Sequence, residues 1–403
     1  MPRAFRSLTR AQRNAFLAAL CGWSLDAFDF FIFIFSLKAI GADFGVDVKS
    51  VAEGIFLTLA FRPLGALAFG WLAERHGRRP ILIFNVLSFS AIEVASAFAP
   101  NLGVLLVLRA LFGFAMGGEW GVGAALALES LPAGRRGLYS GLLQEGYAIG
   151  YLLASIAFAV LFTHIGWRGM FVLGGAPALL ALFIATGVEE SPSWRAGAAR
   201  APATLRASVA AAREHLPLLL YLVILMAAFN AFSHGSQDLY PTFLQVQHGY
   251  SPATTGVIAI VMNCGALLGG IGFGALSERI GRKRAIALAA LLSIPLIPLW
   301  AYAQTAVALA AGGFLMQFMV QGAWGVVPAH LNELSPSAVR AILPGFAYQL
   351  GNLAMAKMGP WQAGIAETHH GDYARVLAWT VGLVAVALIV LASAGPEARA
   401  RAL

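Results

Sequence analysis

The sequence has few charged residues and almost no cysteine. Asp, Glu, Lys and Arg make up 11% of its 403 residues, less than half of the roughly 25% typical of soluble domains. An ordinary soluble domain is therefore excluded. The two cysteines, Cys21 and Cys264, both lie in apolar runs, where a thiol packs as a small apolar group and a disulfide is not expected. Alternating polar and apolar strands, the mark of an outer-membrane barrel, are also missing.

Long apolar runs dominate the sequence instead. Hydrophobic residues make up 59% of the chain, and the mean hydropathy is +0.75. A membrane-spanning helix needs about 20 such residues in a row. Runs of this length lie at 14–37, 51–73, 81–98, 103–125, 139–161, 169–187, 217–240, 253–276, 284–302, 305–328, 340–360 and 374–394. The sequence therefore predicts an all-α membrane protein with about twelve transmembrane helices. No cleavable signal peptide is expected at its N-terminus.

The basic residues predict the orientation of these spans, because cytoplasmic loops retain Lys and Arg. Basic clusters occur before the first span, after spans two, four, six, eight and ten, and after the last span. The opposite loops contain little beyond Lys38, Lys49 and Arg168. We expect an inner-membrane protein with both termini in the cytoplasm. The same bias explains the net charge of +8 and the pI near 9.8, so no nucleic-acid partner is expected.

The two halves of the sequence repeat at a constant offset of 204 residues. GWLAERHGRR at 70–79 returns as GALSERIGRK at 274–283, and GEWG at 118–121 returns as GAWG at 322–325. We expect two pseudo-symmetric six-helix bundles at 1–188 and 217–403, joined by a cytoplasmic linker at 189–216. A duplicated six-span unit is typical of transporters in which two bundles rock about a site between them.

The two repeated loops resemble the signature loops of the major facilitator superfamily, and this resemblance implies that family's fold. Its members usually have Asp where Glu74 and Glu278 stand. Glycine permits close helix approach, and Glu74 can pair with Arg78 across a helix end. We expect a gating role for Gly70, Glu74, Arg75, Arg78, Gly274, Glu278, Arg279 and Arg282.

One hydrophobic segment, NAFSHGSQDLYPT at 230–242, contains several polar side chains. Such groups are costly in lipid and are therefore expected to be functional. In a helix, Asn230, His234, Gln237 and Asp238 form a stripe beside Ser233, which should face a cavity. We expect Asn230, Ser233, His234 and Gln237 to bind substrate. His234 and Asp238 lie four residues apart, so they can hydrogen-bond and exchange protons as a coupled pair.

Arg62 lies near the middle of the second predicted span, where an arginine costs about 2.5–3.5 kcal/mol on insertion scales. Its planar guanidinium group fits a carboxylate through two hydrogen bonds. We therefore expect Arg62 to bind an anionic substrate. The alternative is an internal salt bridge to Asp26 or Asp29, and both roles combine if an acid neutralises Arg62 until the substrate arrives.

Other ionisable residues within the spans are candidates for proton transfer or gating. The proton-coupling candidates are Asp26, Asp29 and Glu119, with Glu93 and Glu145 as further acids. Arg109 begins the small-residue pattern Arg109-x-x-x-Gly113-x-x-x-Gly117 and is expected to be structural or to act in gating. Lys357 is either a second anion contact or a snorkelling side chain.

The polar segment also resembles a known signature. Asn230-x-x-Ser233-His234-x-Ser236-Gln237-Asp238-x-x-x-Thr242 matches, at each fixed position, span seven of the fungal lactate and pyruvate proton symporters. LDAFDFF at 25–31 and FRPLGALAFG at 61–70 are similar to the wider sialate and lactate proton symporter family. The resemblance implies uptake of a carboxylate anion together with a proton, with Arg62 binding the anion and with His234 and Asp238 serving binding and coupling. Members of the sialate branch often carry extra spans in the middle, for which the short linker leaves no room, so we expect a short monocarboxylate. We also expect a monomer without a cofactor.

Two other functions stay open. The same machinery could import another organic anion, such as a dicarboxylate, a sialate or an aromatic acid. A non-transporting sensor is a second alternative, although such proteins usually add a long cytoplasmic domain. An enzyme is not expected, because the sequence has no nucleophile motif or metal-ligand cluster, and the pair His369–His370 is only a weak metal signal.

Overall fold

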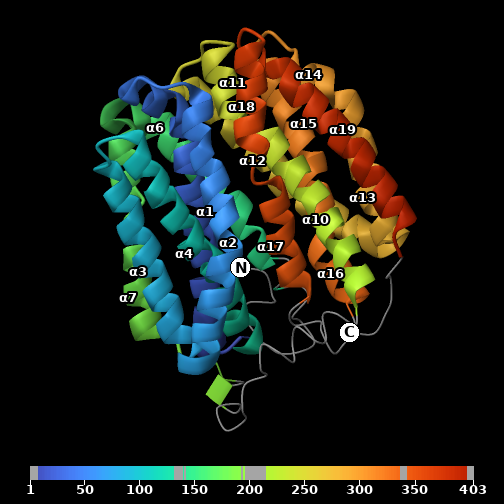
Figure 1. Ribbon diagram of the computed structural model, residues 1–403. Helices are drawn as coiled ribbons and strands as arrows, with labels where there is room; N and C mark the ends of the chain where they lie inside the picture. The colour runs from blue at the N-terminus through green and yellow to red at the C-terminus, as the bar shows by residue number, and fades with distance from the viewer. Residues whose placement is uncertain are drawn as a thin grey trace.

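A computed structural model describes residues 8–130, 139, 142–191, 194–195, 215–335 and 343–396. Across these ranges the regular structure is helical, without strands. Figure 1 shows two bundles side by side, one from each half of the chain. The first contains α1 (Arg10–Phe44), α2 (Val48–His76), α3 (Arg78–Ala97), α4 (Leu102–Ser130), α6 (Gly146–Leu173) and α7 (Ala178–Gly187). The second contains α10 (Leu216–Gln237), α11 (Tyr240–Val246), α12 (Pro252–Ile280), α13 (Arg282–Ser293), η3 (Ile294–Leu296), α14 (Ile297–Ala301), α15 (Ala306–Trp324), α16 (Val327–Leu334), α17 (Leu343–Met355), α18 (Met358–Thr368) and α19 (Tyr373–Ala394). Most of the predicted linker lies outside the described residues.

The helices account for the twelve predicted crossings. Ten stretches of the described chain are long and apolar enough to cross a bilayer. One of them, 142–187, crosses twice, because the chain reverses at Gly166, where the backbone is not helical. Arg168 pairs with Asp43 at one end of α1, whereas the carbonyl of Gly187 accepts a hydrogen bond from Asn14 at the other end. The remaining crossing consists of α17 and α18, so the predicted fold is confirmed.

Several crossings of the second half are interrupted rather than continuous. The predicted spans 217–240, 284–302, 305–328 and 340–360 each contain at least two helices. Proline lies in the first turn of α11, α14 and α16, where its missing N–H leaves no hydrogen bond unmade. Asp238 and Leu239 separate α10 from α11. The polar segment therefore contains a helix break, a feature of transporter binding sites.

Glycines on α4 hold Arg62 in place through close helix packing. An added Cβ at Gly113 would lie 2.1 Å from the carbonyl oxygen of Thr58, and at Gly117 it would lie 2.0 Å from that of Arg62. No larger residue fits without separating α2 from α4, which confirms the expected small-residue face. At Gly70, by contrast, an added Cβ would meet no atom of the described residues within 4 Å. The close helix approach expected at Gly70 is therefore not found within this part of the chain.

Contacts between the two halves close one end of the molecule, which we call the sealed end. At the sealed end, Lys38 donates to the carbonyl of Gln245 at 2.9 Å, and the amide of Lys49 donates to Glu367 at 3.0 Å. Lys357 and Glu53 form a third contact between the halves, at 2.6 Å. α2 and α12 both run from this end to the opposite end, which we call the basic end because Arg75, Arg79, Arg279 and Lys283 lie at the helix ends there. The halves are thus joined at the sealed end.

Candidate functional site

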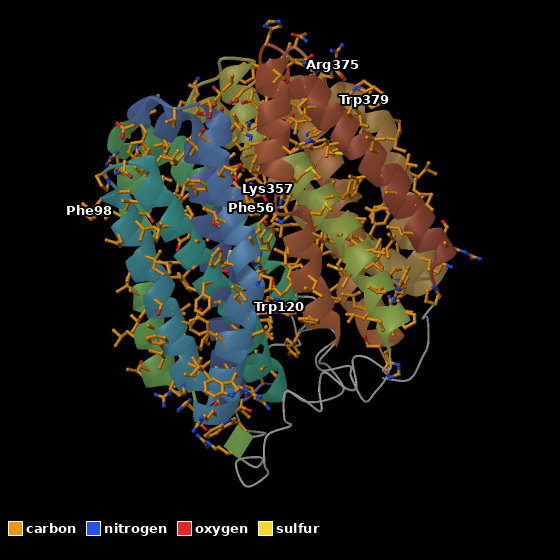
Figure 2. All side chains as sticks on the ribbon, in the orientation of Figure 1. Phe56, Phe98, Trp120, Lys357, Arg375 and Trp379 are labelled. Carbon is orange, nitrogen blue, oxygen red and sulfur yellow. The ribbon has the colours of Figure 1, made fainter. Side chains whose placement is uncertain are left out.

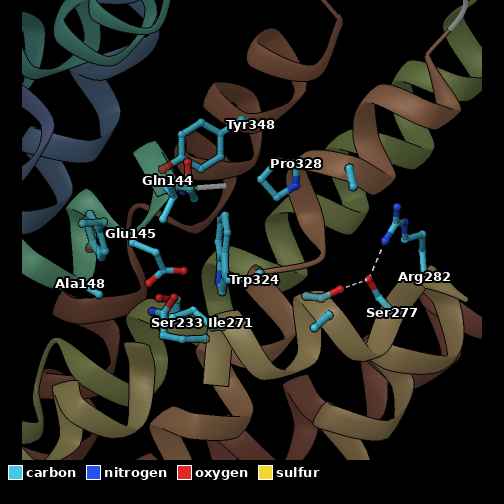
Figure 3. Close-up of a pocket in the computed structure, with 18 of the residues that line it drawn as sticks. Gln144, Glu145, Ala148, Ser233, Ile271, Ser277, Arg282, Trp324, Pro328 and Tyr348 are labelled. Atoms are coloured by element: carbon cyan, nitrogen blue, oxygen red, sulfur yellow. Dashed lines mark hydrogen bonds between the residues drawn. The ribbon is translucent and has the colours of Figure 1, made fainter. Parts of the chain in front are cut away.

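A central cavity of about 480 Å³ lies between the two halves. The first half contributes Leu142 and Gln144 with α6, and the second half contributes α10, α12, α15, α16 and α17. Its lining reaches Glu278, whose side chain is 68% exposed, so the cavity opens at the basic end. Figure 3 shows Glu145, Trp324 and Tyr348 projecting toward one another from different helices. The cavity is therefore shared by the halves and open at one end.

The polar stripe of α10 forms part of this cavity. Asn230, Ser233 and His234 line it, and the side-chain oxygen of Asn230 has no hydrogen-bond partner among the described residues. Gln237 does not line the cavity. Its amide donates to Ser233 at 3.1 Å and to Tyr147 at 3.4 Å. The stripe thus presents an amide, a hydroxyl and an imidazole to a ligand, with Gln237 behind them.

His234 and Asp238 interact as their spacing predicts. Nδ1 of His234 and a carboxylate oxygen of Asp238 are 2.9 Å apart, and both side chains are buried. The ring of Phe30, from α1, meets the His234 ring edge-on at 6.1 Å between centroids. The two side chains therefore form a hydrogen-bonded pair, and this pair lies at the boundary with the first half of the molecule.

Arg62 is buried next to Tyr348, outside the lining of the central cavity, and forms no salt bridge among the described residues. Its side chain is 1% exposed, and Nε and Nη2 have no hydrogen-bond partner within the described part of the chain. The guanidinium carbon lies 5.8 Å from the ring centroids of both Trp23 and Tyr348. Tyr348 itself lines the cavity. The alternative salt bridge from Arg62 to Asp26 or Asp29 is absent among the ion pairs of the described residues.

Three buried acids of the first half also lack partners. Asp26, Asp29 and Glu119 are 0% exposed, and none of their carboxylate oxygens has a hydrogen-bond partner among the residues described. Asp26 and Glu119 lie close enough to Arg62 to interact with it electrostatically. Gly22 makes room for Glu119, because an added Cβ would lie 2.3 Å from its Oε1. These acids surround Arg62 without forming a salt bridge to it.

Arg109 and Lys357 have partners elsewhere. Arg109 forms a buried pair with Glu93 at 2.5 Å and donates to Ser96 at 2.8 Å, which accounts for Arg109 as a structural residue. Lys357 does not line the central cavity, so the expected second anion contact is not found there, and snorkelling stays a prediction. It pairs with Glu53 across the halves, and its ammonium lies 3.9 Å from the centroid of the Phe56 ring beside it in Figure 2.

The second repeated loop forms an ion network at the mouth of the cavity. Arg282 pairs with Glu278 at 2.8 Å and with Glu333 at 2.8 Å. It also donates to Ser277 at 2.6 Å, the contact that Figure 3 marks with a dashed line. Arg279 is exposed, and Gly274 approaches Gly325 only at ordinary contact distance. The Glu278–Arg282 pair is the one that the repeat predicts. Through its contacts with Ser277, Glu278 and Glu333, Arg282 joins α12 and α13 to α16.

The first repeated loop uses a residue that the sequence analysis missed. A carboxylate oxygen of Glu190 accepts the backbone N–H of Arg78 at 3.0 Å, and its other oxygen accepts that of Arg79 at 3.1 Å. An acid here satisfies the free N–H groups at the start of α3. Arg75 is exposed and packs over Trp71. The side chain of Glu74 lies outside the described residues, so its expected pairing with Arg78 stays a prediction.

The aromatic walls of the cavity were also missed. Tyr147, Trp324 and Tyr348 line the cavity together with Glu145. The repeat contained a signal, since the offset of 204 residues aligns Gln144 with Tyr348 and Glu145 with Gln349. Polar residues at matching depths in both halves indicate a shared surface near the pseudo-symmetry axis.

Comparison with known proteins agrees with this architecture. Residues 19–356 match the family model of the Major Facilitator Superfamily. A "Carboxylic acid transporter protein homolog" from Saccharomyces cerevisiae is 29% identical, with 97% of this chain and 69% of the relative covered. A "Probable 4-methylmuconolactone transporter" from Cupriavidus pinatubonensis is 31% identical over 89% of this chain and 85% of the relative. The E. coli xylose transporter XylE in a partially occluded inward-open conformation has a TM-score of 0.79 at 17% identity, over 98% of this chain and 100% of that chain.

The family match covers most of the chain, so the protein belongs to the Major Facilitator Superfamily. It is a multi-span membrane transporter and not an enzyme. The likeness to XylE extends to the fold alone, because the identity is low. What this transporter carries follows from its cavity and not from its fold.

Proposed function

We propose that this protein is a proton-coupled symporter that imports short monocarboxylates of the lactate or pyruvate type by alternating access. The observation that carries the proposal is Arg62, a buried cation near the central cavity whose Nε and Nη2 have no hydrogen-bond partner among the described residues. Buried N–H donors without acceptors are costly, whereas a substrate carboxylate would accept two hydrogen bonds from the guanidinium group. Asn230, Ser233 and His234 would contact the rest of the substrate, with Gln237 positioning Ser233.

The charges around the cavity favour a substrate with one carboxylate. Among the described residues, Arg62 is the cation near the cavity that forms no salt bridge, whereas Arg282 at the mouth is already paired with Glu278 and Glu333. The carboxylate of Glu145 lines the cavity as well. Within this part of the chain, a second carboxylate on the substrate would therefore meet negative charge and no unpaired cation. Relatives named as transporters of a carboxylic acid, cis,cis-muconate and sialic acid support an organic acid as substrate.

The buried acids support coupling to a proton. A carboxylate buried without a partner is costly unless it takes up a proton, and Asp26, Asp29 and Glu119 are all in this position. His234 and Asp238 offer a second site on the other side of the cavity. Asp26 and Glu119 lie near enough to Arg62 to balance its charge when one of them is ionised. When the substrate carboxylate takes over that role, the released acid takes up a proton, so the site gains no net charge and anion and proton cross together. The site then needs no cofactor.

The basic end faces the cytoplasm in this proposal, because Lys and Arg are retained on that side. The arrangement of the halves is then an inward-facing state, with the central cavity open to the cytoplasm and the sealed end outside. Closing the mouth would involve the loops around Arg78 and Arg282, whose networks must rearrange. We place the transporter in the inner (plasma) membrane as a functional monomer with both termini in the cytoplasm.

A larger, ring-bearing acid is the second candidate substrate. The specific observation is that Tyr147, Trp324 and Tyr348 give a cavity of about 480 Å³ three aromatic walls. Aromatic walls pack well against planar ligands. Relatives named as niacin transporters fit this alternative.

Uptake by the purified full-length protein in liposomes tests both candidates. Labelled lactate should accumulate when the outside is acidic, and unlabelled pyruvate should compete while succinate should not. A protonophore should abolish accumulation but leave exchange of labelled for unlabelled lactate intact. Stronger competition by nicotinate or benzoate than by pyruvate would favour the ring-bearing acid. If the folded protein shows no saturable uptake of any acid, the proposal is refuted, and the sensor alternative is favoured instead.

A further inference from the structure

A second hollow lies on the outer surface of the second half, away from the central cavity. This lateral groove has a volume of about 420 Å³ and runs between α18 and α19. Its lining residues are Met358, Trp361, Ile365, His369, Arg375, Val376, Trp379, Thr380, Leu383 and Val384, none of which lines the central cavity. Figure 2 shows Arg375 and Trp379 on the outer side of this bundle, toward the sealed end.

The walls of the groove are apolar and uncovered. Trp361 is 56% exposed and Trp379 is 65% exposed. In a membrane transporter the bilayer covers such a surface. Met358 and His369 are separated by three turns of α18, or about 16 Å at about 1.5 Å per residue. This length matches one leaflet of a hydrocarbon core about 30 Å thick. One acyl chain can therefore lie along the whole groove.

The mouth of the groove carries positive charge with free donors. The side chain of Arg375 is 60% exposed, and its closest anionic contact is Asp372, at 3.8 Å from Nε. That carboxylate already accepts the backbone N–H of Arg375 at the start of α19. His369 ends α18 on the other side of the mouth. A guanidinium group with free N–H groups binds a phosphate through two parallel hydrogen bonds, and tryptophan is the residue that anchors at this membrane depth.

We propose that the lateral groove is a binding site for one anionic phospholipid. The phosphate would bind Arg375 and His369, and one acyl chain would pack between Trp361 and Trp379. The combination of an apolar groove one leaflet long with a cation at its mouth matches a lipid and not a soluble anion. This inference rests on the membrane fold and is independent of the substrate.

Lipid in this groove also acts on the sealed end, because α18 is shared by both. On its other face α18 meets α2, where Glu367 accepts the amide of Lys49 and where Ile55 packs against Gly359. If α18 moves against α19 when it leaves α2, opening the sealed end changes the shape of the groove. A ligand that binds one arrangement better shifts the population toward it. A lipid that fits the present groove better would then favour the state with the sealed end closed.

Lipid retention by the purified full-length transporter tests the site. Native mass spectrometry after delipidation and titration with phosphatidylglycerol or phosphatidylcholine counts the bound lipids. The parent should retain one phosphatidylglycerol preferentially, and Arg375→Ala should weaken its binding about tenfold, as expected for losing a charge-assisted hydrogen bond. Arg168→Ala is the matched control, since Arg168 is also a partly exposed arginine beside a tryptophan at the sealed end but lines no groove.

Two further measurements separate a lipid from a free anion. Trp379→Ala removes a wall without touching the charge, so it should weaken phosphatidylglycerol binding while its thermal melting stays that of the parent. Inorganic phosphate at millimolar concentration should not displace the lipid. Equal retention of both lipids by the parent, unchanged binding in Arg375→Ala, or displacement by inorganic phosphate would each overturn the proposal.

Discussion

Replacing Arg62 with lysine tests the binding role directly, because the change keeps the positive charge and removes the planar fork. Nε and Nη2 of Arg62 have no hydrogen-bond partner among the described residues. The substitution therefore breaks no hydrogen bond of these atoms within that part of the protein. Its main effect should be weaker binding of the substrate. The guanidinium group also lies 5.8 Å from the rings of Trp23 and Tyr348, a position that a compact ammonium fills poorly.

The expected loss can be estimated from one hydrogen bond. A hydrogen bond to a charged group contributes about 1.5–3 kcal/mol, and lysine keeps at most one of the two that a carboxylate would form. Substrate affinity should therefore fall about 10- to 150-fold. The assay is the concentration dependence of lactate exchange in liposomes, with insertion checked by thermal melting and by the orientation of the reconstituted protein.

Arg168→Lys provides the control, because Arg168 pairs with Asp43 on the surface far along α6 from the cavity. It should leave the affinity unchanged. Near-normal affinity in Arg62→Lys, with the protein inserted, would refute the reasoning and remove Arg62 from the binding site.

Three further substitutions test the proton and specificity roles. Asp238→Asn keeps a hydrogen-bonding group beside His234 but cannot carry a proton, so gradient-driven accumulation should disappear while lactate exchange survives; persistent proton co-transport would point to Glu119 or Asp29. Gln237→Ala removes the donor to Ser233 and Tyr147, so the free energy of lactate binding should weaken by about 1–3 kcal/mol. Uptake of longer acids should rise. An unchanged order of selectivity among the acids would place the specificity site elsewhere. Gly22→Ala should displace the carboxylate of Glu119, which lies 2.3 Å from an added Cβ, whereas Gly121→Ala meets no atom within 4 Å. The pH dependence of uptake should change only in the first of these glycine variants, and identical profiles would exclude Glu119 from coupling.

Local features of this protein could be predicted from its sequence. Apolar runs of bilayer length determine where helices cross, and the repeat at 204 residues predicts two similar bundles. The His234–Asp238 and Glu278–Arg282 contacts each join residues four apart. Helix geometry alone brings such residues together. The position of Arg62 near the middle of its span was predictable from the apolar run that surrounds it.

Contacts between distant residues were decided only by the tertiary structure. Lys357 and Glu53 are 304 positions apart, and their pairing depends on how each half rotates against the other. Whether Arg62 meets Asp26, and whether Glu190 reaches the start of α3, depend on the rotation of each helix about its axis. The apolar pattern of a buried helix constrains that rotation weakly, because lipid and protein interior are both apolar. The aromatic walls of the cavity likewise exist only where Tyr147, Trp324 and Tyr348 converge from separate helices.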